Sequence, residues 1–431
     1  IQNCGAVAVT TLSLLRSAEL ARIMEIARPR LAVCDAGWTD ELQQATGLAE
    51  VECDVLSYAE DGGELEQKMA RWPDHFDNFQ TLSDDISLIG FTSGTTGGPK
   101  ATIHFHRDVL SVCRTVADHV IRPQPEDVFI STSPLAFTFG LGGLLMFPLY
   151  GASSAVLNAH YTPQSLLATI QRTQASICFT VPTFYQRMAR ITDGAETASL
   201  RISISSGETL PLPVRTAWKD ATGLDMTELL GSTEMLHAFI GSSGSEIREG
   251  FIGRALTGYK ATILDEDGMP AEPGTIGRLA VKGPTGCRYL DDPRQQKYVQ
   301  RGWNVTGDAC TMDVAGYIAY HTRLDDMIIS AGYNISGIEV ENTLLDHPLV
   351  AECAVIGTED PERGQVVTAY VVPRPFTQGK DALIAELQAY AQGRLAPYKY
   401  PRKVYLLSAL PRNESGKIQR FRLGERNEQP A

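Results

Sequence analysis

The chain has 431 residues, 43% of them hydrophobic and 21% charged. At about 150 residues per domain, this length suggests two or three domains, and the composition excludes a disordered polyelectrolyte. The chain carries 38 lysines and arginines against 51 aspartates and glutamates, so its formal net charge is −13. We therefore expect no nucleic-acid partner, because sequence-independent binding to a phosphate backbone needs a basic face. A local site for an anionic small molecule is compatible with this charge.

The eight cysteines are spread over the chain, and no two of them have CxxC spacing. This usage is typical of reduced thiols in a cytoplasmic enzyme and argues against a disulfide framework or a zinc site. The first residues show neither the charged start nor the cleavage site of a signal peptide. We therefore expect a cytoplasmic protein.

Residues 128–171 contain no Asp, Glu, Lys or Arg, and Ala136–Leu157 within them is long enough to span a bilayer. The stretch is either a membrane span or the buried core of an α/β domain. Its many glycines, Pro148 and the missing cationic flanks favour the buried core. We therefore expect no membrane partner.

Up to about residue 258, the sequence predicts alternating strands and helices, which indicates α/β layers around a largely parallel sheet. Apolar residues at helical spacing predict the helices Ser17–Ala27 and Pro163–Thr173. Short β-branched runs predict the strands Leu31–Cys34, Val128–Ser131, Ser154–Leu157, Ile177–Val181 and Arg201–Ser205. From Tyr259 onward, turn signals between strands indicate a more antiparallel, barrel-like part with Lys260–Asp265, Arg278–Lys282 and Tyr317–His321.

The last part of the chain predicts a compact α+β unit of about 105 residues, within the usual size of a domain. Its predicted helices are Gly337–Leu345 and Ala382–Leu395. Its predicted strands are Met327–Ser330, Cys353–Gly357, Val366–Val372 and Lys403–Leu407. We place the boundary near Asp325, so the predicted domains are residues 1–324 and 325–431.

The strongest local signal is the glycine- and threonine-rich stretch 92–100, which follows the apolar run Ile86–Phe91. Its glycines let backbone N–H groups turn toward an anion, its hydroxyls add donors, and Lys100 adds positive charge. A polyphosphate needs these groups, although Pro99 stands where a Walker A loop has glycine. The alternative is a flexible surface loop.

Three further stretches carry residues suited to nucleotide chemistry. Glu234 follows the turn residues 231–233 and can bind Mg²⁺, which prefers one or two carboxylates plus phosphate oxygens. Asp308 can accept both hydroxyls of a ribose, and Arg323 can pair with a phosphate or ribose oxygen. Lys417, close to a glycine near the chain end, can reach a site on another domain. The alternatives are a helix-start carboxylate, a surface turn with a surface arginine, and a solvated lysine.

In this order, the four stretches resemble the motifs of the adenylate-forming superfamily, which includes acyl-CoA synthetases, adenylation domains and luciferases. Ser206-Gly207-Glu208-Thr209 resembles its adenine-contact turn, and residues 323–333 resemble its hinge and thioester-forming loop. The resemblance covers nearly the whole chain. It implies an α/β fold: a large N-terminal domain of layered subdomains with a small barrel-like part, then a small mobile α+β domain with the catalytic lysine.

The resemblance also implies residue roles. Catalysis is implied for Lys417, Glu234 and Thr95, with Glu234 as the Mg²⁺ ligand. Asp325 is the implied hinge. The implied coenzyme A loop is Ser330, Ala331, Gly332 and Tyr333. Binding of ATP and AMP is implied for Thr92, Ser93, Gly94, Thr96, Gly97, Lys100, Ser206, Gly207, Glu208, Thr209, Gly231, Ser232, Thr233, Asp308 and Arg323.

The stretch Gly231–Phe239 closely resembles the aryl branch of the family, the benzoate-CoA and 2-aminobenzoate-CoA ligases, and residues 5–20 and 139–142 agree. By this resemblance, the aryl pocket is lined by Thr138, Phe139, Gly231, His237 and Ala238. Amino-acid-activating relatives place an Asp near residues 137–139, whereas residues 136–140 contain no acid here. A flat apolar wall suits an aromatic ring, and His237 can donate to a carboxylate or an ortho substituent. The alternative for His237 is a core histidine.

Some residues depart from the family pattern. Thr322 and Leu230 stand where the family often has glycine and tyrosine. The family also has a further N-terminal stretch before the region that matches Ile1, so we expect the start of the first subdomain to be missing. His104 and His106 have H-x-H spacing without a third ligand nearby in the sequence, so we expect no metal site there.

We therefore expect an ATP-dependent aryl-CoA ligase that uses ATP, Mg²⁺ and coenzyme A. One alternative transfers the aryl group to the phosphopantetheine of a carrier protein, and another is an inactive nucleotide-binding fragment. The choice between benzoate and 2-aminobenzoate stays open, because one small substituent changes selectivity by only about 1–3 kcal/mol. Whether the chain forms a homodimer also stays open.

Overall fold

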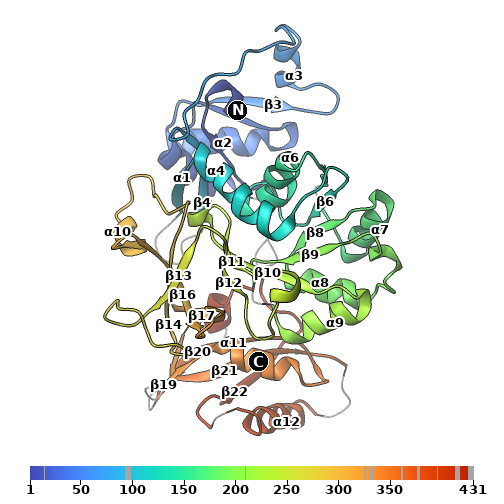
Figure 1. Cartoon of the computed structure of the whole chain (residues 1–431), viewed down its shortest axis with the longest axis vertical. Helices are drawn as coiled ribbons and strands as arrows, with labels where there is room; N and C mark the ends of the chain where they lie inside the picture. Colours follow the sequence, from blue (N-terminus) through green and yellow to red (C-terminus); the bar gives the residue numbers. More distant parts are fainter. Residues whose placement is uncertain are drawn as a thin grey trace.

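A computed structural model of the chain describes residues 1–431 except 14, 93–98, 159, 209, 325–326, 331–332, 361–362, 376–378, 396, 413–417 and 426–431. Figure 1 shows a large N-terminal part, coloured blue to yellow, above a small C-terminal part, coloured orange to red. The elements of these two parts are described below in chain order.

The first layer of the large part is a three-stranded sheet in the order β1-β4-β5. The strand β1 (Ala8–Val9) runs parallel to β4 (Ile86–Thr92), and β5 (Lys100–Phe105) pairs with β4 in an antiparallel hairpin. A separate parallel pair is formed by β2 (Leu31–Asp35) and β3 (Asp54–Tyr58). The accompanying helices are α1 (Ser17–Ala27), α2 (Thr39–Ala49) and α3 (Glu64–Met69).

The central layer is a seven-stranded sheet in the order β12-β11-β10-β9-β8-β6-β7. Its five parallel strands are β6 (Val128–Ser131), β7 (Ser154–Val156), β8 (Ile177–Thr180), β9 (Ile202–Ser205) and β10 (Met226–Gly231). Two antiparallel edge strands complete it, β11 (Ala238–Gly241) and β12 (Arg254–Ala255).

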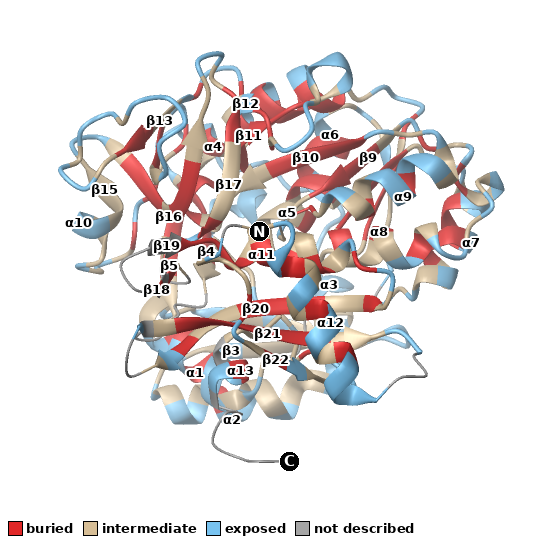
Figure 2. Ribbon diagram, turned by 90° about the horizontal axis from the view of Figure 1, so that it is seen from below, coloured by how far each residue is buried: buried red, intermediate tan, exposed pale blue. Residues whose placement is uncertain are grey.

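Helices cover both faces of this sheet. One face packs on α7 (Pro163–Thr173), α8 (Pro182–Ala189) and α9 (Leu212–Thr222). The other face packs on α4 (His106–Val112), which continues as a π-helix (Cys113–Ile121), and on α5 (Thr138–Leu141), a π-helix (Gly142–Met146) and α6 (Phe147–Tyr150). Phe129 and Ile130 join the two opposite cores, as the two-residue period of a strand requires. Buried residues accordingly fill the strands in Figure 2.

A five-stranded antiparallel sheet follows, with β13 (Lys260–Leu264), β14 (Gly277–Lys282), β15 (Val299–Gln300), β16 (Trp303–Met312) and β17 (Ile318–Arg323). The short helix α10 (Gln295–Tyr298) precedes β15. Every strand pair in this sheet is antiparallel, as predicted from the turn signals.

The C-terminal part is a second five-stranded sheet in the order β19-β18-β21-β20, with β22 beside β21. Its strands are β18 (Ile328–Ser330), β19 (Tyr333–Ile335), β20 (Val350–Asp360), β21 (Gly364–Pro373) and β22 (Lys403–Leu406). Its own apolar core includes residues of α11 (Gly337–Leu345) and α12 (Lys380–Gln392), and the chain continues to α13 (Phe421–Glu425).

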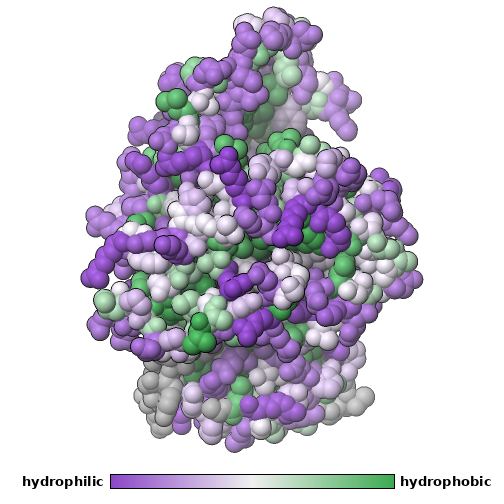
Figure 3. All heavy atoms as spheres, in the orientation of Figure 1, coloured by the Kyte–Doolittle hydropathy of each residue, from purple (hydrophilic) through white to green (hydrophobic). Residues whose placement is uncertain are grey.

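The predicted elements are confirmed with small changes at their ends. The helices Ser17–Ala27, Pro163–Thr173 and Gly337–Leu345 have the predicted bounds. The uncharged stretch became β6, a helical segment, β7 and most of α7, as the core interpretation required. Across the described residues, we find no helix with the length and apolar character that a bilayer crossing requires. Hydrophilic residues cover most of the face in Figure 3.

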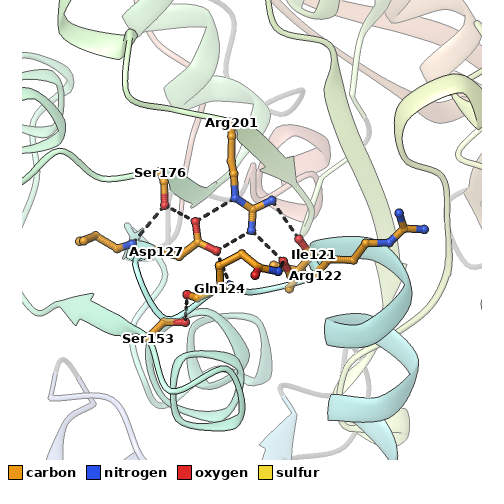
Figure 4. A network of polar contacts seen from close by, with 8 residues as sticks. Ile121, Arg122, Gln124, Asp127, Ser153, Ser176 and Arg201 are labelled. Carbon is orange, nitrogen blue, oxygen red and sulfur yellow. Dashed lines mark hydrogen bonds and ion pairs between the residues drawn. The ribbon is translucent and has the colours of Figure 1, made fainter.

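A polar network ties together the amino ends of the parallel strands (Figure 4). Asp127, just before β6, accepts hydrogen bonds from Arg201 Nε at 2.8 Å and from Ser176 Oγ at 2.7 Å. Arg201 also bonds the backbone carbonyls of Ile121 and Arg122 at 3.1 Å. The network joins the residues that lie directly before β6, β8 and β9.

Candidate active site

The glycine- and threonine-rich stretch connects the strands β4 and β5. Thr92 at the end of β4 pairs with Lys100 at the start of β5, so residues 93–99 connect the two strands along the chain. The predicted phosphate-binding residues Ser93, Gly94, Thr95, Thr96 and Gly97 lie outside the described residues. Lys100 Nζ lies 5.3 Å from the centroid of the Tyr289 ring.

Two more predicted stretches follow neighbouring parallel strands. The strands β9 and β10 pair up to Ser205 and Glu228, so their carboxyl ends lie at the same edge of the sheet. Ser206, Gly207 and Glu208 therefore lie beside the turn that contains Glu234. Gly207 has φ of +86°, a conformation that favours glycine. Thr209 is outside the described residues.

The turn between β10 and β11 places Glu234 and His237 on one short segment. Gly231 pairs with Ala238, and a Cβ on Gly231 would lie 2.6 Å from the carbonyl oxygen of His237, so this hairpin closes only around glycine. Glu234 is in a single 3₁₀ turn, Thr233–Met235. The buried Leu236 after it has φ of +68°, which is strained for leucine. Strain of this kind concentrates at functional sites.

Glu234 is buried, and its Oε1 accepts a hydrogen bond of 2.8 Å from the hydroxyl of Tyr289. Ser232, two residues earlier, lies 3.4 Å from the hydroxyl of Tyr298. Burial, with the charge of Glu234 as the next cause, raises the pKa of both tyrosines well above its usual range. Both phenols therefore stay protonated, and that of Tyr289 donates to Glu234.

Asp308 and Arg323 face each other on the neighbouring strands β16 and β17. Arg323 Nη1 donates to Asp308 Oδ1 at 3.0 Å and to the carbonyl of Thr306 at 3.1 Å. Burial raises the pKa of Asp308; Arg323 opposes this rise and the carboxylate of Glu234 adds to it. The structure thus brings Asp308 and Arg323 within electrostatic reach of Glu234.

Two of the predicted aryl-binding residues, Phe139 and His237, lie in an aromatic cluster. The ring of Phe139 lies 5.2 Å from that of Phe179 and 6.1 Å from the imidazole of His237. Phe147 meets the imidazole edge-on at 4.9 Å. A Cβ on Gly142 would lie 2.5 Å from His237 Nε2, so glycine is required where the helix approaches the histidine. Thr138 begins the same helix, and Ala238 is buried at the start of β11.

His237 is an unusual buried residue. Its side chain is 3% exposed, and neither ring nitrogen has a hydrogen-bond partner among the described residues. Burial lowers its pKa to about 3, and the nearby backbone of Phe139 offsets only part of this fall. Buried polar groups are nearly always hydrogen-bonded, so an unpaired imidazole needs a ligand or water. Both predicted roles of His237, a pocket residue and a core histidine, stay open, because His104 is buried and unpaired in the same way.

The C-terminal part meets the site through Arg412. This residue bonds Glu352 of β20 at 2.8 Å and lies 3.9 Å from Glu208 of the predicted adenine turn. Its backbone pairs with that of Ile418 in an isolated bridge. Lys417 itself lies outside the described residues.

The other predicted C-terminal positions are less well defined. Ser330 is buried in β18 and pairs with Gly364. Tyr333 begins β19, and its side chain is outside the described part. Asp325, Ala331 and Gly332 also lie outside the described residues, so the roles of the hinge and the coenzyme A loop stay predictions.

Several residues at the site carry no local sequence signal. Phe179 lies in β8, Tyr289 in a short loop and Tyr298 at the end of α10, and Phe147 lies in the uncharged stretch. Their role depends on neighbours far away in the sequence. His104, the first histidine of the H-x-H pair, is fully buried, and burial lowers its pKa to about 4. The described residues contain no cluster of three or more metal-ligating side chains.

Comparison with known proteins identifies the family. Residues 1–288 match the family described as AMP-binding enzyme, and residues 339–417 match the AMP-binding enzyme C-terminal domain. The chain belongs to the AMP-binding enzyme family. It falls among the acyl-CoA synthetases of this adenylate-forming family, with 35% identity over 361 residues to a benzoate–CoA ligase from Thauera aromatica. That match covers 82% of this chain and 68% of the Thauera enzyme.

Solved structures of AMP-binding enzymes share the fold. An anthranilate CoA ligase, AuaEII, solved with anthranoyl-AMP, is 30% identical with a TM-score of 0.91, covering 99% of this chain and 83% of that one. ATP-bound MatB from Rhodopseudomonas palustris is 30% identical with a TM-score of 0.91, covering 99% and 85%. For apo MatB from the same organism, the TM-score is 0.79. The predicted fold class is confirmed.

Proposed function

We propose that this chain is an ATP-dependent aryl-CoA ligase that activates benzoate or 2-aminobenzoate. The observation that carries the proposal is the cluster around His237, where an unpaired neutral imidazole faces aromatic rings and no acid occurs in residues 136–140. Such a wall suits a planar aromatic ring. The free imidazole N–H can donate to an oxygen or nitrogen of the substrate. The benzoate–CoA ligase and anthranilate CoA ligase found among its relatives agree with this proposal.

In the first half-reaction, a carboxylate oxygen of the aryl acid attacks the α-phosphorus of ATP, and the bond to the β-phosphate breaks to release pyrophosphate. The chain supplies position and charge neutralisation rather than covalent chemistry. Lys100 and the 93–98 loop would hold the phosphates, and Asp308 would bind the ribose. Lys417 would bridge the carboxylate and phosphate oxygens.

The residues at the turn fit a magnesium ion. Mg²⁺ prefers one or two carboxylates together with phosphate oxygens rather than a cage of protein ligands. Glu234 is such a single buried carboxylate, and the described residues hold no larger ligand cluster. Glu234 would therefore hold the ion, which when bound neutralises charge on the phosphates.

In the second half-reaction, the thiol of coenzyme A attacks the acyl carbonyl, AMP leaves with the electron pair of the broken C–O bond, and the thiol proton passes to solvent. We propose that the domain of residues 325–431 turns about Asp325 so that the loop of Ser330–Tyr333 replaces Lys417 at the site. Two alternatives are a carrier-protein thiol as acceptor, and an inactive nucleotide-binding fragment.

The test is pyrophosphate release with ATP and Mg²⁺ against benzoates, fatty acids and amino acids, each with and without coenzyme A. We expect release with benzoates and an aryl-CoA product that requires coenzyme A. Aryl-AMP that coenzyme A cannot discharge would favour the carrier-protein alternative. Release only with fatty acids or amino acids would refute the aryl assignment, and no release with any acid would favour the inactive fragment.

A further inference from the structure

Tyr289 is a buried residue that no predicted motif contains, yet its hydroxyl bonds the carboxylate of Glu234 at 2.8 Å. Its backbone is held on both sides by β5, through hydrogen bonds from Ile103 N to the carbonyl of Arg288 at 2.8 Å and from Leu290 N to the carbonyl of Ala101 at 2.9 Å. The backbone on either side of Tyr289 is therefore tied to the strand that begins at Lys100.

A third backbone contact closes this support. The amide of Tyr289 donates to Oε1 of Gln295 at 2.7 Å, and Gln295 Nε2 in turn donates to the carbonyl of Cys287 at 3.0 Å. The ring of Tyr298 packs edge-on against the ring of Tyr289 at 5.9 Å. The phenol is thus a rigid donor whose position is set by packing and not by its own flexibility.

The hydrogen bond divides the two oxygens of Glu234 between two tasks. Oε1 is occupied by Tyr289. Oε2 has no hydrogen-bond partner among the described residues, and it is not one of their fully buried, unpaired polar atoms. A carboxylate held by one oxygen presents the other in a fixed direction, which is what a small cation with strict geometry requires.

Tyr289 also lies beside the other charge of the phosphate region. Lys100 Nζ is 5.3 Å from the centre of its ring, within the range of a cation–π contact. The side chain of Tyr289 therefore contacts both Lys100 and Glu234, although these three residues are far apart in the sequence.

We propose that Tyr289 is a positioning residue for adenylate formation, which holds Glu234 so that Oε2 faces the divalent cation on the phosphates of ATP. The inference rests on the proposed function. It adds a residue whose hydroxyl acts on the cation through Glu234 and does not touch ATP or the aryl acid. Outer partners of metal ligands typically change metal affinity by about 10–100-fold.

The test compares Tyr289→Phe with Tyr185→Phe. Tyr185 is also fully buried, and its hydroxyl donates to the backbone carbonyl of Cys178 at 2.9 Å and not to Glu234. Both substitutions remove one buried hydroxyl and keep the ring. Binding of Mn²⁺ in the presence of ATP is measured by electron paramagnetic resonance, and ATP binding in excess EDTA is measured by calorimetry.

We expect Tyr289→Phe to weaken Mn²⁺ binding about tenfold and to leave metal-free ATP binding unchanged, while Tyr185→Phe changes neither. Equal Mn²⁺ affinity in the two variants would overturn the proposal. Loss of metal-free ATP binding in Tyr289→Phe would identify a general structural role and overturn it as well. If wild type releases no pyrophosphate with any acid, the proposed function fails, but the Mn²⁺ comparison still decides the role of Tyr289.

Discussion

Replacing Arg201 by methionine should destabilise the large domain, because the buried carboxylate of Asp127 would lose its cation. The Asp127 side chain is 5% exposed, and that of Arg201 is 36% exposed. Arg201 donates to both carboxylate oxygens, through Nε at 2.8 Å and Nη2 at 2.6 Å. Figure 4 shows that the same guanidinium also bonds the backbone before β6, so one substitution removes several contacts.

The cost can be estimated from this geometry. Removing one partner of a buried ion pair costs about 3–5 kcal/mol. Two features place the cost of losing Arg201 near the lower end of this range. About a third of the Arg201 side chain reaches solvent. Asp127 also keeps its hydrogen bonds from Ser176 Oγ and Gln124 N, both at 2.7 Å. We expect a loss of about 3 kcal/mol in the free energy of unfolding.

The assay is urea unfolding followed by tryptophan fluorescence, in which Trp218 reports on a core of the same domain. Lys219→Met is the matched control, because Lys219 pairs with Asp225 at 3.0 Å with both side chains well exposed. Exposed pairs contribute about 0–1 kcal/mol. If the two variants lose the same free energy at an unchanged m-value, the reasoning about Asp127 is refuted.

The same variant predicts a pH dependence. Burial alone would raise the pKa of Asp127, but the bonds from Arg201, Ser176 and Gln124 together hold it below its ordinary value. A carboxylate with a lowered folded-state pKa stabilises the fold above its unfolded pKa of about 3.9 and loses this contribution as the pH falls through the folded pKa. The difference in the free energy of unfolding between wild type and Arg201→Met should therefore have its full value at neutral pH and decrease below about pH 4.

Three further predictions concern the site. Gly142→Ala should raise KM for the aryl acid several-fold and leave KM for ATP unchanged in the pyrophosphate assay. The reason is that the new methyl would lie 2.5 Å from His237 Nε2, and overpacking costs about 1–3 kcal/mol. Equal changes in both constants would contradict this prediction. Burial lowers the pKa of His237 to about 3, so KM for benzoate should depend on pH alike in wild type and His237→Gln between about pH 5 and 8; a step present only in wild type would show that His237 titrates. Arg412→Met should slow aryl-AMP formation several-fold and leave aryl-CoA formation from supplied aryl-AMP unchanged. The reason is that Arg412 links the C-terminal part to Glu208. Equal slowing of both steps would show that this contact does not favour aryl-AMP formation in particular.

Local signals in the sequence were enough to predict most of the helices and strands. The helix Pro163–Thr173 has its predicted bounds because apolar spacing and the capping residue Thr162 act within a few residues. Strand ends were less accurate, since β20 spans Val350–Asp360 and not Cys353–Gly357. A strand ends where its partner ends, and the partner is a property of the sheet.

The residue types for nucleotide chemistry were also readable in sequence order. The pair Asp308 and Arg323 follows from two adjacent antiparallel strands, whose spacing is short along the chain. The roles of all the predicted site residues stay predictions, and Lys417, Asp325 and residues 93–98 also lie outside the described residues.

Only the tertiary structure could show how distant residues act on one another. The π-helical segment Gly142–Met146 has no sequence signature of its own, yet it lets the helix pack against His237. The contact of Tyr289 with Glu234 joins residues 55 positions apart. Propensity and periodicity act through neighbours in the chain, whereas a hydrogen bond or a buried charge depends on distances that exist only after the layers have packed.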